Sequence, residues 1–137
     1  MTHKINRVKA IQRAIDIRAK RACYELRSLI DQRSKRSTES IRWFFEDAAE
    51  TASNDDIYQM VLSALAVRRD FRDWPYNKVW DTLFNLLKTD DRDKTISIGR
   101  VLISETAKAA KPRMLRSFAE SYIALVESQA DLLKSRA

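Results

Sequence analysis

Three arginines, Arg68, Arg69 and Arg72, lie close together in the middle of the chain. Apolar residues recur around them at three- and four-residue steps from Val61 to Phe71, so a helix would carry an apolar stripe with arginines beside it. Guanidinium groups form paired hydrogen bonds with phosphate oxygens. The pattern predicts a helix that packs along one edge and meets an anion along the other. A core helix with a solvated charged margin is the alternative.

A second basic cluster brackets Pro112, where the last helix is expected to begin because proline suits the first helical turn. We predict that two of its members, Lys111 and Arg116, join Arg69 and Arg72 on one surface that neutralises phosphates. The full cluster comprises Lys108, Lys111, Arg113 and Arg116.

The residues that most enzyme and metal sites need are scarce. The one histidine, His3, lies beside the N-terminus, and the one cysteine, Cys23, lies on the apolar side of a helical pattern and is expected in the core. Gly99 stands alone, so no glycine loop can cradle phosphates. The aspartates between Thr89 and Lys94 lack the glycine and glutamate of a calcium loop and are expected to cap a helix. We therefore expect no catalytic residue, no metal and no cofactor.

The formal net charge of +7 is concentrated at one end of the chain. Residues 1–36 contain 11 Lys/Arg and 3 Asp/Glu, whereas the rest contains 15 and 16. A ladder formed by Lys9, Arg13, Lys20 and Arg27 follows one flank of the N-terminal helical pattern, where it could track phosphates or form an ordinary solvated face. The charge predicts an anionic partner, nucleic acid before membrane, and a solubilising surface is the alternative.

The composition predicts a helical scaffold for these residues. One glycine and two prolines in 137 residues are too few for the turns of a sheet protein. We expect one all-α domain over residues 1–137, a compact bundle of about five to six helices with a long basic N-terminal helix over about 2–33. The later helices are expected at about 38–51, 57–74, 75–87, 95–102 and from 112 onward. Gly99 is expected where another backbone approaches closely.

No apolar run approaches the length of a membrane span, which is about 18 residues or more. The N-terminus alternates isoleucine with lysine and arginine and so does not resemble a signal peptide. We expect a soluble cytoplasmic protein without membrane contact.

Three segments, taken in order, resemble the small all-helical subunit of type III-A CRISPR effector complexes. Ser37-Thr-Glu-Ser-Ile-Arg42 is similar to the family's Thr-Thr-Ser-x-Leu-Arg. Leu62-x-x-Leu65-x-x-Arg68-x-x-Phe71 resembles its Leu-x-x-Leu-x-Pro-Arg-x-x-Tyr helix. Leu115-Arg-Ser-Phe118-x-x-x-Tyr122-x-Ala124-Leu-Val126 resembles its terminal Leu-x-x-Phe-x-x-x-x-x-Ala-hydrophobic-hydrophobic pattern.

The resemblance implies a non-catalytic RNA-binding subunit of an antiviral defence ribonucleoprotein. Its implied partners are a guide RNA paired with target RNA, larger CRISPR backbone subunits and stacked copies of itself. Arg42 and Arg68 are the basic positions that the resemblance marks. A small subunit of another multisubunit CRISPR complex remains an alternative.

Two other functions fit the sequence. One is a free-standing helical nucleic-acid-binding accessory protein, which would bind tightly on its own with a steep salt dependence. The other is a protein-interaction module or inhibitor that uses Trp43, Trp74 and Trp80 as anchors.

Overall fold

The computed structural model describes the backbone of residues 21–135 and the side chains of residues 21–129. Within this part of the chain every regular element is a helix, so the predicted all-α class is confirmed. The expected N-terminal helix is helical over residues 21–32, and its first part, residues 1–20, lies outside the described residues. The later helices are α2 (Lys35–Thr51), α3 (Asn54–Arg68), α4 (Asn77–Leu87), α5 (Arg92–Ala109) and α6 (Pro112–Ser135).

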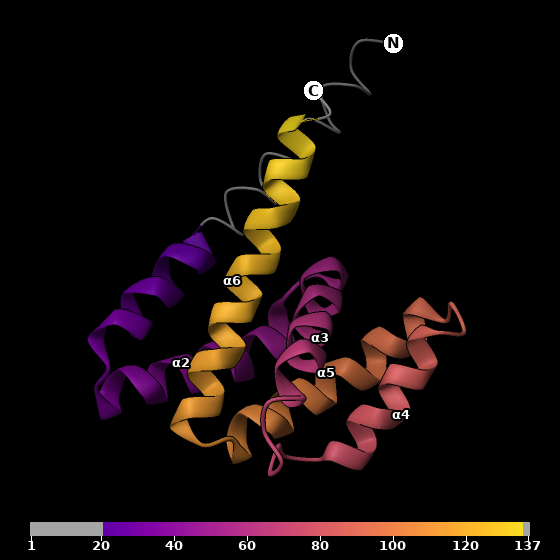
Figure 1. The fold of residues 1–137 in the computed structure, drawn as a ribbon, viewed down its shortest axis with the longest axis horizontal. Helices are drawn as coiled ribbons and strands as arrows, with labels where there is room; N and C mark the ends of the chain where they lie inside the picture. Colours follow the sequence, from indigo (N-terminus) through magenta and orange to yellow (C-terminus); the bar gives the residue numbers. More distant parts are fainter. Residues whose placement is uncertain (1–20, 136–137) are drawn as a thin grey trace.

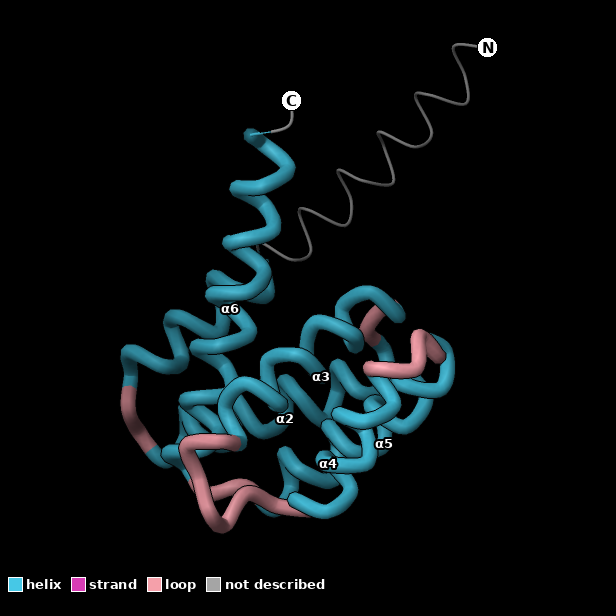
Figure 2. The backbone as a smooth tube through the Cα atoms, turned by 45° about the vertical axis from the view of Figure 1, so that its right-hand side comes forward, coloured by secondary structure: helices cyan, strands magenta, loops and turns pink. Residues whose placement is uncertain are grey.

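Helix α5 is in contact with three other helices of the bundle. Helices α2, α3 and α4 all pack against it, and α3 and α2 also pack against α6. Helix 21–32 runs alongside α6 in the opposite direction, at the outside of the bundle (Figure 1). The C-terminal part of α6 extends past the other described helices (Figures 1 and 2).

Short polar side chains cap three of the described helices. Ser34 and Ser37 form a capping box at the start of α2, in which each side chain accepts the other residue's backbone N–H. Ser53 accepts the backbone N–H of Asp56 at α3. Asp91 accepts the N–H of Lys94 at α5, so one of the three close aspartates is a helix cap.

Two arginines join α2 and α5 by capping each other's helix ends. Arg42 of α2 donates from Nη1 to the carbonyls of Ala107, Lys108 and Ala110 at 2.5 to 3.0 Å, where α5 ends. Arg100 of α5 donates to the carbonyls of Ala49 and Ala52 at 3.2 and 2.8 Å, where α2 ends. The last carbonyls of a helix lack intrahelical hydrogen-bond partners and lie at the negative end of the helix dipole. Each guanidinium therefore donates hydrogen bonds to these carbonyls and places a positive charge at that end. These contacts also show that α2 and α5 are antiparallel.

A chain of aromatic rings fills the space between α2, α6 and the α3–α4 loop. Phe45 and Phe118 meet edge to face with centroids 4.1 Å apart, and Trp74 stacks on Phe118 at 6.2 Å. At the α4–α5 contact, the buried Trp80 donates from Nε1 to Thr106 Oγ1 at 3.0 Å. Each of these four rings is thereby either packed against another ring or paired through its polar atom.

The observed ends of α3 and α4 differ from the predicted ones. Helix α3 ends at Arg68 and not near Trp74, because the N–H groups of Asp70 and Phe71 bond to carbonyls three residues back and the chain turns away. Helix α4 begins at Asn77 after Tyr76, which has a left-handed φ of 59°. The eight-residue loop between them, residues 69–76, allows Trp74 to reach the core, where it is 2% exposed.

Gly99 marks the close contact between α5 and α3, as the sequence suggested, although its neighbour there is a side chain and not backbone. A Cβ atom at this position would lie 2.5 Å from Cγ2 of Val61, which is fully buried. The glycine is helical without a positive φ, so the reason for it is space and not backbone conformation.

We expect Gly99→Ala to destabilise the protein. Alanine favours a helix by about 1 kcal/mol over glycine, but overpacking at a rigid β-branched neighbour costs about 1–3 kcal/mol. Urea unfolding should show a lower free energy of unfolding for Gly99→Ala. In a Val61→Ala background the same change should be stabilising, because the clashing methyl group is gone. A stabilising effect in both backgrounds would contradict the packing explanation.

Candidate nucleic-acid interface

The α3–α4 loop and the α5–α6 turn lie next to each other at one end of the bundle, the lower end in Figure 1. The Nζ atom of Lys111 contacts Oδ2 of Asp73 at 2.5 Å across this junction. The guanidinium of Arg113 lies over the ring of Phe71, 5.8 Å from its centroid. We call this region the basic end, defined by the loop 69–76 and residues 108–116. Its cations are Arg69, Arg72, Lys108, Lys111, Arg113 and Arg116.

Buried aromatic packing holds the loop of the basic end in place. Trp74 is stacked on Phe118 of α6, and the ring centroid of Phe71 lies 6.2 Å from that of Trp74. Asn77 donates from Nδ2 to the carbonyl of Arg72 at 3.2 Å, which fixes the outer part of the loop to the start of α4. The arginines at 69 and 72 are therefore carried by an anchored loop, although loops are often mobile.

Arg69 and Arg72 are the free cations of the loop. Both side chains are exposed, and neither forms a hydrogen bond or ion pair with any residue in the described part of the chain. Each guanidinium keeps its donors available for an external anion. Two negative charges, Asp70 and Asp73, lie in the same loop.

Asp73 is a counter-charge to Lys111. The hydrogen bond from Lys111 is the main cause that lowers the pKa of the Asp73 carboxyl from its ordinary value. Asp73 is therefore ionised at neutral pH and partly neutralises Lys111. Sequence reasoning missed this pairing because the two residues are 38 positions apart.

The start of α6 is favourable for an anion. The preceding residue is Lys111, whose side chain has no acceptor for the free N–H groups of the first turn, and that turn contains no acidic residue. Nε of Arg116 and Nε1 of Trp74 are also buried without a hydrogen-bond partner among the described residues. The positive end of a long helix thus coincides with unpaired donors and nearby cations.

Arg42 and Arg68 have intramolecular partners. The Arg42 side chain is 17% exposed and bonds to the end of α5. The Arg68 side chain is also 17% exposed, and its Nη2 lies 2.6 Å from Oδ1 of Asp81 on α4. Both lie near the basic end, but their polar atoms hold helices together. The structure therefore brings the six predicted residues to one region, where Arg42 and Arg68 hold helices together and the Arg69 and Arg72 side chains have no partner among the described residues.

The tryptophans do not form a common anchor surface. Trp74 and Trp80 are 2% and 0% exposed, so the idea that all three are protein-binding anchors is wrong for these two. Trp43 is 63% exposed on α2. Cys23 is buried, as predicted, and burial raises the pKa of its thiol above its ordinary value.

The described residues hold no group of three or more histidine, cysteine, aspartate or glutamate side chains that could bind a metal ion. Within residues 21–135, no helix is long and apolar enough to cross a bilayer. Comparison of the chain with known protein families, curated proteins and solved structures finds no significant match.

The different partners of Arg42 and Arg69 predict that the two residues contribute unequally to stability. Arg42→Ala should lower the free energy of unfolding by about 1.5–3 kcal/mol, because it leaves the end carbonyls of α5 without their charged donor. Arg69→Ala is the matched control and should change it by less than about 0.5 kcal/mol. Thermal and urea unfolding of both variants measure the difference. Equal stability of the two variants would show that Arg42 does not serve as a cap.

Proposed function

We propose that this chain is a non-catalytic nucleic-acid-binding protein and that the basic end is its contact surface. The observation that carries the proposal is the juxtaposition of two unpaired loop arginines with the basic start of α6. Phosphate groups match this surface because they accept several hydrogen bonds and carry the complementary charge.

Contacts of this kind favour binding without sequence reading. The cations come from a loop and a helix start, and the two nearby aromatic residues, Phe71 and Trp74, are half-buried and buried. Bases could not stack on Trp74 without displacing it from the core. The surface therefore fits the phosphates of a strand whose sequence is recognised by other means.

The more specific form of the proposal is an RNA-binding small subunit of a CRISPR ribonucleoprotein, which would line the channel for target RNA. It rests on the three segments that resemble that family. Many of their apolar positions are core residues in the fold, among them Leu115, Phe118 and Tyr122. In such a complex base pairing with the guide would supply specificity, so a phosphate-binding surface would be sufficient. The implied partners remain guide and target RNA, larger backbone subunits and further copies of this chain.

The double variant Arg69→Glu/Arg72→Glu tests the contact surface. We expect it to bind a labelled single-stranded RNA about tenfold or more weakly in fluorescence anisotropy at low salt. The slope of log Kobs against log salt should fall in magnitude by about 1.4, because each phosphate neutralised on a single strand contributes about 0.7.

A matched control for the same charge change is Lys88→Glu/Lys94→Glu. These two exposed lysines lie at the end of α4 and the start of α5, at the opposite end of α5 from the basic end. The control should retain most of the affinity. If both double variants lose affinity equally, net charge and not the basic end determines binding.

Removing the counter-charge of Lys111 should strengthen binding. Asp73→Asn releases the lysine and deletes a carboxylate beside the phosphates, so we expect affinity for RNA to rise by about two- to fivefold. Because the pKa of Asp73 is lowered, its carboxylate keeps its charge as the pH falls into the mildly acidic range. The gain from Asp73→Asn should therefore persist there. A loss of affinity would mean that the Lys111–Asp73 contact positions the surface.

Gentle affinity purification from the native host tests the CRISPR form separately. Recovery of larger CRISPR subunits together with repeat-derived guide RNA would support it. Recovery of nucleic acid without such subunits would favour a free-standing nucleic-acid-binding protein.

A further inference from the structure

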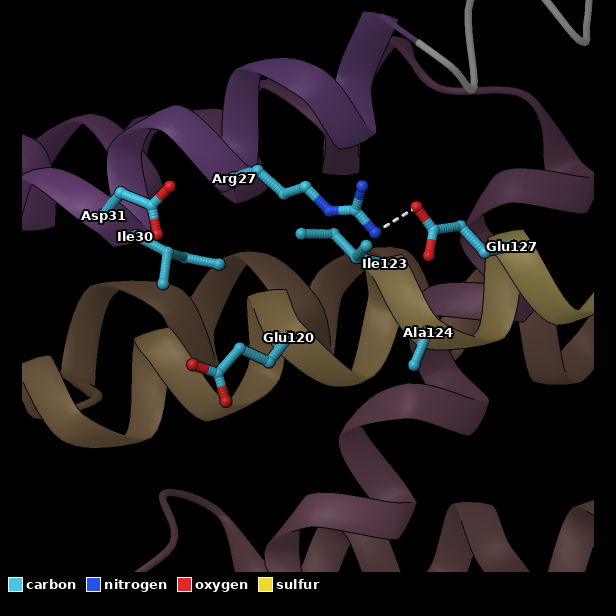
Figure 3. A pocket seen from close by; sticks show the side chains of 7 residues that line it. All are labelled: Arg27, Ile30, Asp31, Glu120, Ile123, Ala124 and Glu127. Carbon is cyan, nitrogen blue, oxygen red and sulfur yellow. Dashed lines mark hydrogen bonds and ion pairs between the residues drawn. The ribbon is translucent and has the colours of Figure 1, made fainter.

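A groove of about 230 Å³ lies between helix 21–32 and the middle of α6. Its apolar surface comes from Ile30, Ile123 and Ala124. An ion pair between Arg27 and Glu127 closes one end (Figure 3). Arg27, which the sequence placed on a basic ladder, therefore pairs with α6.

Two unpaired carboxylates flank the other end of the groove. Asp31 and Glu120 extend from the two helices on this side (Figure 3). Both are exposed, and neither forms an ion pair or side-chain hydrogen bond within the described part of the chain. The groove thus combines an apolar strip with a local excess of negative charge, on a chain whose net charge is +7.

The chain itself contains a segment with the complementary pattern. Residues 1–20 include six Lys/Arg and one Asp/Glu. Their apolar residues recur at helical steps from Ile5 to Ile15, with Lys9 and Arg13 beside that stripe. A segment of this pattern can place apolar side chains along the strip while its cations meet carboxylates at the margin.

We propose that the groove receives the basic N-terminal segment, residues 1–20, of a second copy of this chain. Ile30 and Ala124, the partly exposed and the exposed apolar residues of the groove, contact the apolar residues of the incoming segment, and Asp31 and Glu120 pair with its cations. The contact joins two different surfaces, so it is heterologous and can repeat from copy to copy.

A second copy suits the groove better than two other occupants. The segment of the same chain joins helix 21–32 at Arg21, so it would have to reverse direction at that point to run along residues 27–31. Nucleic acid phosphates would be repelled by the two unpaired carboxylates. The proposal concerns self-association and does not depend on RNA binding at the basic end.

Charge reversal on each side of the contact, followed by combination, tests the proposal with the full chain. Sedimentation equilibrium of the wild type should show a mass that rises above the 16.0 kDa monomer with concentration and falls again with added salt. Asp31→Lys/Glu120→Lys and, separately, Lys9→Glu/Arg13→Glu should each weaken association by about tenfold or more. Mixing these two variants should restore association, because each supplies the charge that the other now needs.

Asp47→Lys/Glu50→Lys is the matched control, since it makes the same charge change on exposed residues of α2. It should associate as the wild type does. The proposal is overturned if the wild type remains monomeric, if the groove variant associates normally, if the mixed variants do not associate, or if the control loses association equally.

RNA binding distinguishes this proposal from the proposed function. The groove variant, which gains four positive charges, should bind RNA at least as tightly as the wild type at concentrations where both are monomeric. Arg69→Glu/Arg72→Glu should still self-associate. Weaker RNA binding by Lys9→Glu/Arg13→Glu with unchanged association would assign the N-terminal segment to nucleic acid and overturn the proposal.

Discussion

The reciprocal capping of α2 and α5 by Arg42 and Arg100 is the constraint on which the basic end depends. Carbonyl groups at helix ends must be satisfied, and here each helix supplies the donor for the other. The Arg42 contact fixes the end of α5 within two residues of Pro112, where α6 begins. Lys111 and the positive end of α6 are thereby positioned beside the loop that carries Arg69 and Arg72.

Arginines that lie close together in this fold differ in whether their side chains have partners. Arg42 and Arg68 are largely buried and paired with helix-end carbonyls and with Asp81, whereas Arg69 and Arg72 are exposed and unpaired within the described residues. A guanidinium whose hydrogen bonds are already made gains little from a phosphate, because binding would first break those bonds. Free donors on an anchored loop bear no such cost. This difference gives Arg42 and Arg68 a structural role and leaves Arg69 and Arg72 available for the proposed contact with nucleic acid.

The sequence predicted those features of the fold that depend on residues close together in the chain. The scarcity of glycine and proline indicated helices, and Asp91, one of the aspartates expected to cap a helix, caps α5. It was wrong about the end of α3, because the loop 69–76 is held by a tertiary contact, the stacking of Trp74 on Phe118 of α6. The sequence also did not reveal the structural roles of Arg42 and Arg68. The carbonyl of Ala107 that Arg42 contacts is 65 positions away in the chain, and Asp81, the partner of Arg68, lies on the next helix. Residue type and spacing identify candidate cations, but only the tertiary contacts show which of them are free.

Arginine-selective chemical footprinting of the intact chain, read by mass spectrometry with and without single-stranded RNA, tests this division most directly. Arg69 and Arg72 should react readily in the free protein and become protected when RNA binds. Arg42 and Arg68 should react slowly in both states, because their donors are engaged within the fold. Protection of Arg69 and Arg72 would establish the basic end as the contact surface. Unchanged reactivity of both, under conditions where RNA is bound, would contradict the account and place the nucleic acid elsewhere.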